Sequence, residues 1–324
     1  MKLGVWADRR EPFATGNAPV VGSISGGRTS AMMAALMDDT AMLVFQNTSR
    51  EHPRTLDYLQ RLEDALRRPI IWLEYRSPPA KTDAPSKAGF AVVTPATACR
   101  DGSVFRQLLE DLRDYRAAKG EGPIAPWARS RICTAYLKHR VQERYLKSIG
   151  IETYDSFIGL RKDEPERVRA IQARDTQAKA YKCPLFDAGI VKTDVLAFWR
   201  EQSFDLELTD IQGNCTGCFL KDESDIARVM NEPESDIAWW DAMSADFPGF
   251  GGQRFKGYRV LAAEMPVRLS IENALREKRE PISDGSMPAA RFKLVRRQEE
   301  RRFRNELPAF SCACESTVAL ADDE

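Results

Sequence analysis

The chain has little that would place it in a membrane or on a polyanion. Its 324 residues contain no uninterrupted apolar stretch of about 18 residues, which is the length that a spanning helix needs. The N-terminus has no apolar core of signal-peptide length. Lys plus Arg and Asp plus Glu number 48 each, so the formal net charge is zero. We therefore expect a cytoplasmic protein without a membrane partner, while a nucleic-acid acceptor stays open because local basic patches need no net charge.

The sequence also lacks a Walker A string and a fixed-period repeat. Its most informative stretch is residues 19–30, PVVGSISGGRTS, in which an apolar β-type run breaks and a helical pattern follows. The turn consists of Ser25, Gly26, Gly27, Arg28, Thr29 and Ser30. Glycines allow a sharp turn, and free N–H groups, the helix dipole and three hydroxyls face one point. This predicts an anion site, most simply for phosphate; a Ser-capped turn without a ligand is the alternative.

Strand-like and helical runs alternate along the first part of the chain. The apolar runs cover residues 20–25, 41–48 and 69–76, and helical patterns cover 29–37 and 54–67. This alternation predicts an α/β fold with a doubly wound, mainly parallel sheet. Because ligands lie beyond the carboxyl ends of such strands, Asn47 and Thr48 should meet the glycine turn. We expect His52 to be a surface turn residue, and residues 77–98 to form a long connection, either a lid or a surface excursion.

The seven cysteines, in a chain without an export signal, indicate ligands, nucleophiles or buried thiols rather than disulfides. Cys133 begins a helical pattern over residues 133–148, and a helix start favours the thiolate. Cys215 and Cys218 form a C-x-x-C whose sulfurs can reach one metal. A metal site follows, but spacing alone does not separate an iron–sulfur cluster from zinc.

The glycine turn resembles the SGGxxS signature of the PP-loop superfamily, which includes the N-type ATP pyrophosphatases and the phosphoadenylyl-sulfate reductase family. FQNTSREHP is similar to that family's second-strand motif, and Gly159-x-Arg161 with Arg167 to its fourth-strand motif. The resemblance covers residues 19–221 in family order. It implies that Asn47, Thr48, Arg161, Arg167 and the turn bind an adenine nucleotide, either ATP or a sulfonucleotide, with Mg²⁺.

Iron–sulfur members of this family carry a Cys-Cys pair and a later C-x-x-C. Here the pair reads Cys133-Thr134, so the resemblance implies three of the four usual thiolate ligands of a 4Fe-4S cluster. One iron of the cluster would then lack a cysteine and could bind another ligand, such as sulfide or the substrate. Alternatively, Cys183 is the fourth ligand. Zinc remains the alternative metal.

Residues 222–324 read as a helical accessory region after a domain over 1–221, with Trp239 and Trp240 as core or interface residues. Assimilatory reductases of the family end in a tail whose cysteine attacks the substrate's sulfur. The tail FSCACEST does not match the family string. Our hypothesis is that Cys312 or Cys314 works over the site as a catalytic thiol; two inert thiols are the alternative.

Two enzyme mechanisms follow from these features. A third hypothesis is a sensor that binds a nucleotide or a metal without catalysis. In one, ATP activates an acceptor oxygen as an adenylate, which a sulfur donor displaces. In the other, a thiolate attacks a sulfonucleotide and releases sulfite. The intact SGGxxS and Thr134 favour the first, with Arg28 as a catalytic residue in place of the usual Lys. A sulfur-donor or reductant protein is a further expected partner, and the oligomeric state is left open.

Overall fold

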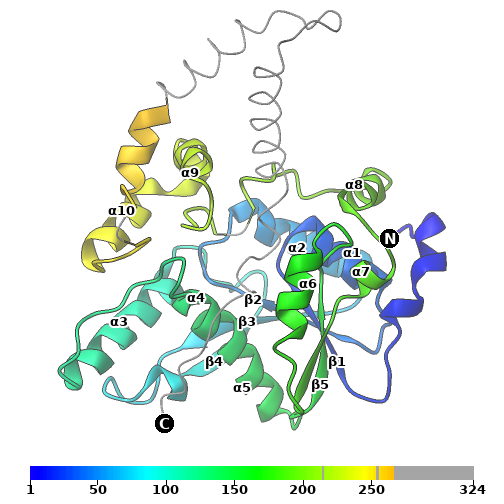
Figure 1. Ribbon diagram of the computed structural model, residues 1–324, viewed down its shortest axis with the longest axis horizontal. Coiled ribbons are helices and arrows are strands. Elements are labelled where there is room, and N and C mark those ends of the chain that lie inside the picture. The colour runs from blue at the N-terminus through cyan, green and yellow to red at the C-terminus, as the bar shows by residue number, and fades with distance from the viewer. Residues whose placement is uncertain (214, 253–254, 266–324) are drawn as a thin grey trace, which may run out of the picture.

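The computed structural model describes residues 1–213, 215–252 and 255–265, and contains a six-stranded sheet in the order β4-β3-β2-β1-β5-β6 (Figure 1). β1 pairs in parallel with β2 and β5, β3 continues the parallel sheet beside β2, and β6 does so beside β5. β4 is antiparallel to β3. The strands are β1 Val20–Ile24, β2 Met42–Gln46, β3 Ile70–Arg76, β4 Gly89–Val93, β5 Tyr154–Ile158 and β6 Lys179–Lys182. The expected doubly wound, mainly parallel sheet is confirmed. Its strand order reverses between β1 and β5, where such sheets bind ligands.

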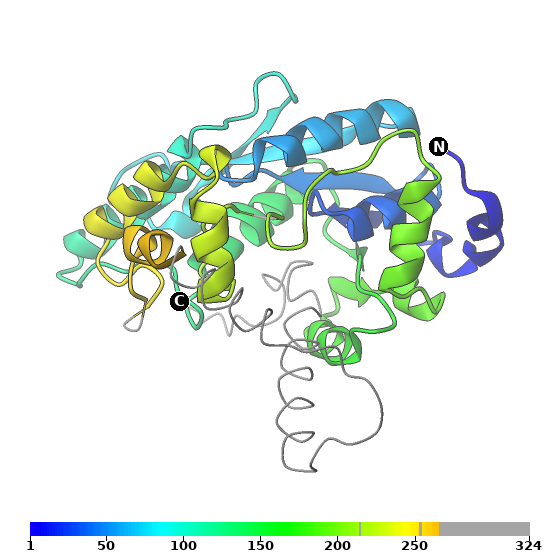
Figure 2. The same ribbon diagram turned by 90° about the horizontal axis from the view of Figure 1, so that it is seen from above.

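Helices lie on both faces of the sheet (Figures 1 and 2). A π-helical segment, Ala135–His139, joins α4 to α5, so the helix expected over residues 133–148 is present with a bulge in its middle. The helices are α1 Arg28–Leu36, α2 Pro53–Leu66, α3 Ser103–Ala118, α4 Ile132–Thr134, α5 Arg140–Ser148, α6 Pro165–Gln172, α7 Pro184–Asp187, α8 Lys192–Arg200, α9 Glu223–Met230 and α10 Ile237–Asp246. Short 3₁₀ turns cover Gly4–Arg9, Glu11–Phe13, Pro85–Lys87 and Pro233–Ser235.

Alternate residues of the central strands enter two different hydrophobic clusters. Ile24 packs with α1, α2 and α8 on one face, whereas Val21 packs with α3 and α5 on the other. Burial on both faces explains why these strands read as near-continuous apolar runs. α9 and α10 join the second cluster through Ile226 and Trp240, beside α3 in both views. Trp240 is fully buried and Trp239 packs on the same cluster, so the expectation that they are core residues is confirmed.

Two local expectations were wrong. Residues 77–98 are not a structureless connection, because β4 lies within them and pairs with β3 along the sheet edge. Phe90 of β4 packs on Tyr145 of α5, a contact between distant segments that local periodicity does not reveal. His52 is not a surface residue: it is 2% exposed, and its Nδ1 accepts a hydrogen bond from the Arg54 N–H to cap α2.

At the start of α8, which begins at Lys192, the Asp194 carboxylate accepts a hydrogen bond from the N–H of Val191. Within the described ranges, no helix is both long and apolar enough to cross a bilayer.

The turn after β5 lies directly against the start of α1. A Cβ on Gly159 would come within 2.9 Å of the Ser30 Cα and 3.1 Å of its backbone nitrogen. Only a residue without a side chain allows β5 and α1 to approach this closely.

We therefore expect Gly159→Ala to lower the free energy of unfolding by about 1–3 kcal/mol, because backbone atoms must move to admit the methyl group. Gly122→Ala is the control, since a Cβ there meets nothing within 4 Å. Urea unfolding of both variants measures the effect. Equal stability of the two would contradict the close approach of β5 and α1.

Candidate functional site

The glycine turn between β1 and α1 has a conformation that only glycine suits. Gly26 has a φ of +80°, and a Cβ there would lie 2.3 Å from Thr55 Cγ2. The Ser30 hydroxyl accepts from the Ser25 N–H at 3.1 Å and lies 3.0 Å from the Ser25 hydroxyl. Gly27 is the N-cap of α1. The turn is therefore a preformed loop that presents the start of α1 beyond the end of β1.

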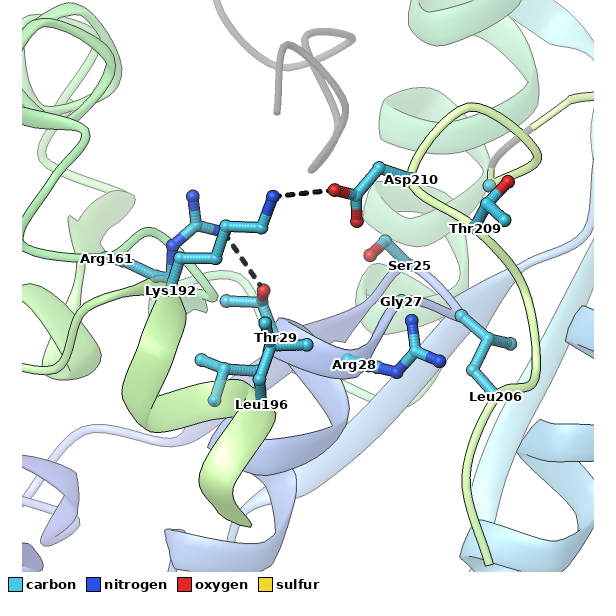
Figure 3. Close-up of a pocket in the computed structure, with 12 residues that line it drawn as sticks. Ser25, Gly27, Arg28, Thr29, Arg161, Lys192, Leu196, Leu206, Thr209 and Asp210 are labelled. Atoms are coloured by element: carbon cyan, nitrogen blue, oxygen red, sulfur yellow. Dashed lines mark hydrogen bonds and ion pairs between the residues drawn. The ribbon is translucent and has the colours of Figure 1, made fainter. Parts of the chain in front are cut away.

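A pocket opens over this loop, between α1, α8 and the segment that follows α8 (Figure 3). The cavity itself has a volume of about 80 Å³, and the hollow around it, which is open to solvent, holds about 620 Å³. Its lining residues are Ser25, Gly27, Arg28, Thr29, Arg161, Lys192, Val195, Leu196, Leu206, Thr209, Asp210 and Gly213. Polar groups come from the loop and cations from three elements, so the pocket has the donors that an anionic ligand requires.

Arg28 fastens the segment after α8 to the loop. Its Nε and Nη2 donate to the Asp205 carboxylate at 2.6 and 2.8 Å, and its Nη1 donates to the Leu208 carbonyl at 2.9 Å. Burial opposes the charge of Arg28, yet the bonds to Asp205 leave its pKa raised. The guanidinium thus lines the pocket while holding one of its walls.

Arg161 and Arg167 lie differently. Arg161 is 3% exposed in its side chain and donates to the Thr29 hydroxyl at 3.2 Å. It also pairs with Asp163 at 3.0 Å and with Glu164 at 3.4 Å. Arg167 pairs with Glu164. The structure therefore brings Arg161 into contact with the glycine turn. Arg167 instead contacts Glu164, the carboxylate that it shares with Arg161.

The turn after β2 leads to the cysteines rather than to this pocket. Asn47 is buried and donates to Glu74 and to the Cys99 carbonyl. Thr48 Oγ1 donates to Glu51 at 2.8 Å and lies 3.1 Å from Cys215 Sγ. Burial raises the pKa of Glu51. Asn47 thus holds β2 to its neighbours, and Thr48 contacts Cys215, one of the predicted metal ligands.

The charges of Cys133, Cys215 and Cys218 all act on one buried hydroxyl, that of Tyr258. Tyr258 donates to the Gly217 carbonyl at 2.6 Å. Burial first, and then the negative charge of the three nearby thiolates, raises the Tyr258 pKa well above its usual value. On the other side of the C-x-x-C, the buried Lys221 ammonium donates to the carbonyls of Cys215 and Thr216, each at 3.1 Å.

These thiols fit a metal or cluster in donor type. Three sulfurs with buried cations nearby suit an iron–sulfur cluster, and they suit zinc as well. In the part of the chain that the structure describes, no three His, Cys, Asp or Glu side chains are already arranged as a metal site. The thiols would have to turn toward one another to hold a metal.

Cys183 lies elsewhere, in a hydrophobic cluster around β5, α6 and β6, and its side chain is fully buried. It is the N-cap of α7. Cys312 and Cys314 fall outside the described residues.

Sequence reasoning missed Lys192, Asp205 and Asp210 at the pocket. The two aspartates lie between α8 and α9 with no motif around them. Lys192 did carry a signal, because a cation at the first position of a helix is unfavourable to the helix dipole.

Comparison with known proteins gives one distant relative of interest. The chain is similar to an uncharacterized nin region protein, ORF290, of Escherichia phage lambda, with 28% identity over 227 residues that cover 65% of this chain and 72% of that protein. No family model matches the chain.

A carboxylate beside Cys99 gives a pH-dependent prediction. Hydrogen bonds from the Cys99 thiol and then from the Ser103 N–H lower the pKa of Asp101 to about 2. A depressed folded-state pKa stabilises the protein above the unfolded value of 3.8, and this contribution is lost as the pH falls toward 2.

We expect Asp101→Asn to cost about 0.5–1 kcal/mol in unfolding free energy at pH 7, since the group is mostly solvated and its charge is screened. The two proteins should converge in stability between pH 4 and pH 2. Denaturant titrations across this range measure the difference, and a gap that is constant with pH would contradict the assignment.

Proposed function

We propose that this chain is a PP-loop enzyme, similar to the phosphoadenylyl-sulfate reductase family, that binds ATP and uses it to put sulfur into an acceptor. The observation that carries the proposal is the course of the chain after α8, over residues 201–213 and 215–218. This segment lines the pocket over the glycine turn with Leu206, Thr209 and Asp210, and then supplies Cys215 and Cys218. One stretch of chain thus joins a site suited to phosphate and a site suited to sulfur.

The pocket supplies what an adenylation needs. The hydroxyls of Ser25 and Thr29 and the first N–H groups of α1 bind the polyphosphate, and Arg161 holds the Thr29 hydroxyl in place. An oxygen of the acceptor attacks the α-phosphorus, the bond from that phosphorus to the bridging oxygen breaks, and pyrophosphate leaves with the electron pair. The fixed donors stabilise the charge that develops on it. Sulfide then attacks the acceptor's carbon, a C–S bond forms as the C–O bond breaks, and AMP leaves with the electron pair.

The cysteines keep the sulfur chemistry beside this pocket. A cluster held by Cys133, Cys215 and Cys218 would supply an iron that carries the sulfur atom. The residues around them favour the charged thiolate: Lys221 and Arg50 are buried cations whose charges interact with that of Cys215. Thr48 fixes the position of Cys215 through its hydroxyl.

Reduction of a sulfonucleotide is the competing function. A reductase would bind the sulfonucleotide in the same pocket but would release sulfite in place of pyrophosphate. Product analysis therefore separates the two, and tight nucleotide binding without either product would indicate the sensor.

Ser30 gives the direct test of the nucleotide pocket. Ser30→Ala removes the hydroxyl that ties Ser25 and Gly27 together, and we expect it to weaken Mg·ATP binding about tenfold, which corresponds to roughly 1.4 kcal/mol. Calorimetric titration measures the affinity, and pyrophosphate release from ATP measures turnover.

Ser148→Ala is the matched control, because its hydroxyl also donates to a backbone carbonyl but lies at the end of α5. Wild-type affinity in Ser30→Ala, or sulfite as the product from phosphoadenylyl sulfate with no pyrophosphate from ATP, would refute the proposed reaction.

The cysteine assignment makes a second prediction. We expect Cys133→Ala, Cys215→Ala and Cys218→Ala each to lose most of the bound iron, because each removes one of only three thiolate ligands. Cys183→Ala should retain it, since that thiol belongs to a separate core cluster. Iron, sulfide and zinc are measured per chain after anaerobic purification.

If the purified protein contains zinc and no iron, the cysteines form a structural zinc site and not an iron–sulfur cluster. Full iron in any of the first three variants would contradict the ligand set.

A further inference from the structure

Three cations line the pocket, and two of them are firmly held. Arg28 makes two hydrogen bonds to Asp205, and its side chain is 18% exposed. The more deeply buried Arg161 lies between Asp163 and Glu164. Separating the buried Arg161 from Glu164 costs about 3–5 kcal/mol. Arg28 is held instead by three hydrogen bonds, two to the Asp205 carboxylate and one to the Leu208 carbonyl, so neither guanidinium is easily transferred to a ligand.

The third cation, Lys192, has a weaker partner. Its Nζ lies 2.6 Å from Asp210 Oδ2, with the two side chains 30% and 53% exposed. Pairs as exposed as this contribute about 0–1 kcal/mol. Of the ion pairs that line this pocket, the Lys192–Asp210 pair is therefore the one that a ligand breaks at the smallest cost.

The position of this pair is not explained by the stability of α8. Lys192 is the first residue of α8, where the helix dipole disfavours a positive charge. Asp210 comes from the segment after α8, and Figure 3 shows the pair spanning the pocket above Ser25 and Thr29. An anion in the pocket would lie close to the Lys192 ammonium, with the N-termini of α1 and α8 on either side of it.

We propose that Lys192 and Asp210 form an exchangeable pair that recognises the polyphosphate of Mg·ATP; this rests on the proposed function. When the nucleotide binds, the Lys192 ammonium leaves Asp210 for a phosphate oxygen. The Asp210 carboxylate, freed from the ion pair, becomes a ligand for Mg²⁺, an oxygen-preferring cation. Binding of Mg·ATP thus replaces one ion pair within the protein by two interactions, from Lys192 to phosphate and from Asp210 to Mg²⁺. A nucleotide with a single phosphate, such as AMP, gains less binding free energy from the exchange.

The experiment compares Mg·ATP with AMP as probes of the full chain. We expect Lys192→Met to weaken Mg·ATP binding about tenfold while AMP binding changes less than twofold, and Lys192→Arg to restore most of the loss. Asp210→Asn should bind metal-free ATP at least as well as the wild type but lose the enhancement that Mg²⁺ gives. Lys87→Met is the control, because Lys87 forms a comparable exposed pair with Asp83 at 2.8 Å, away from the pocket.

Thermal unfolding of each variant, set beside Lys87→Met, establishes that it is folded. Wild-type affinity for Mg·ATP in Lys192→Met, with the wild type binding ATP normally, would overturn the exchange and leave the proposed function standing. Equal losses for ATP and AMP would also overturn it. If the wild type binds neither nucleotide, both the exchange and the proposed function fail.

Discussion

The candidate site depends on the ion pair between Arg28 and Asp205. Arg28 begins α1, and Asp205 lies in a segment with no helix or strand of its own until α9. The pair, together with the bond from Arg28 to the Leu208 carbonyl, fixes this segment against the glycine turn. Because the same segment continues into Cys215, which contacts Thr48, the position of the thiols follows from that of the pocket wall. The distance between the pocket and the cysteines of the C-x-x-C is thus set by contacts that join α1 and β2 to one irregular stretch of chain.

The charges around the pocket divide into fixed and exchangeable ones. Arg28 and Arg161, held by carboxylates and by neighbouring oxygens, shape the walls of the pocket. The more exposed pair of Lys192 with Asp210 stabilises the protein little. Under the proposed function, this division would let a chain of zero net charge present a cation to a polyanion.

Local signals predicted much of the fold. The alternation of apolar runs and helical patterns placed β1, β2, β3, α1 and α2 close to their observed bounds. The glycine turn was placed correctly because its signal lies within a few consecutive residues. Contacts between distant residues were not accessible: Asp205 follows Arg28 by 177 positions, and nothing near Asp205 indicates its partner. The burial of His52 and the pairing of β4 depend in the same way on segments that the fold brings together. A common site for Cys133, Cys215 and Cys218 was expected from a family resemblance and stays a prediction, whereas Tyr258, on whose hydroxyl their charges act, carried no signal.

The most direct test of the central claim is a crystal structure of the anaerobically purified protein grown with Mg²⁺ and an ATP analogue that resists cleavage between the α- and β-phosphates. The account predicts the polyphosphate over Ser25–Ser30, between the starts of α1 and α8, with the α-phosphate facing the side on which Cys215 lies. An analogue bound elsewhere on the chain, or a glycine turn that remains empty at saturating nucleotide, would contradict it.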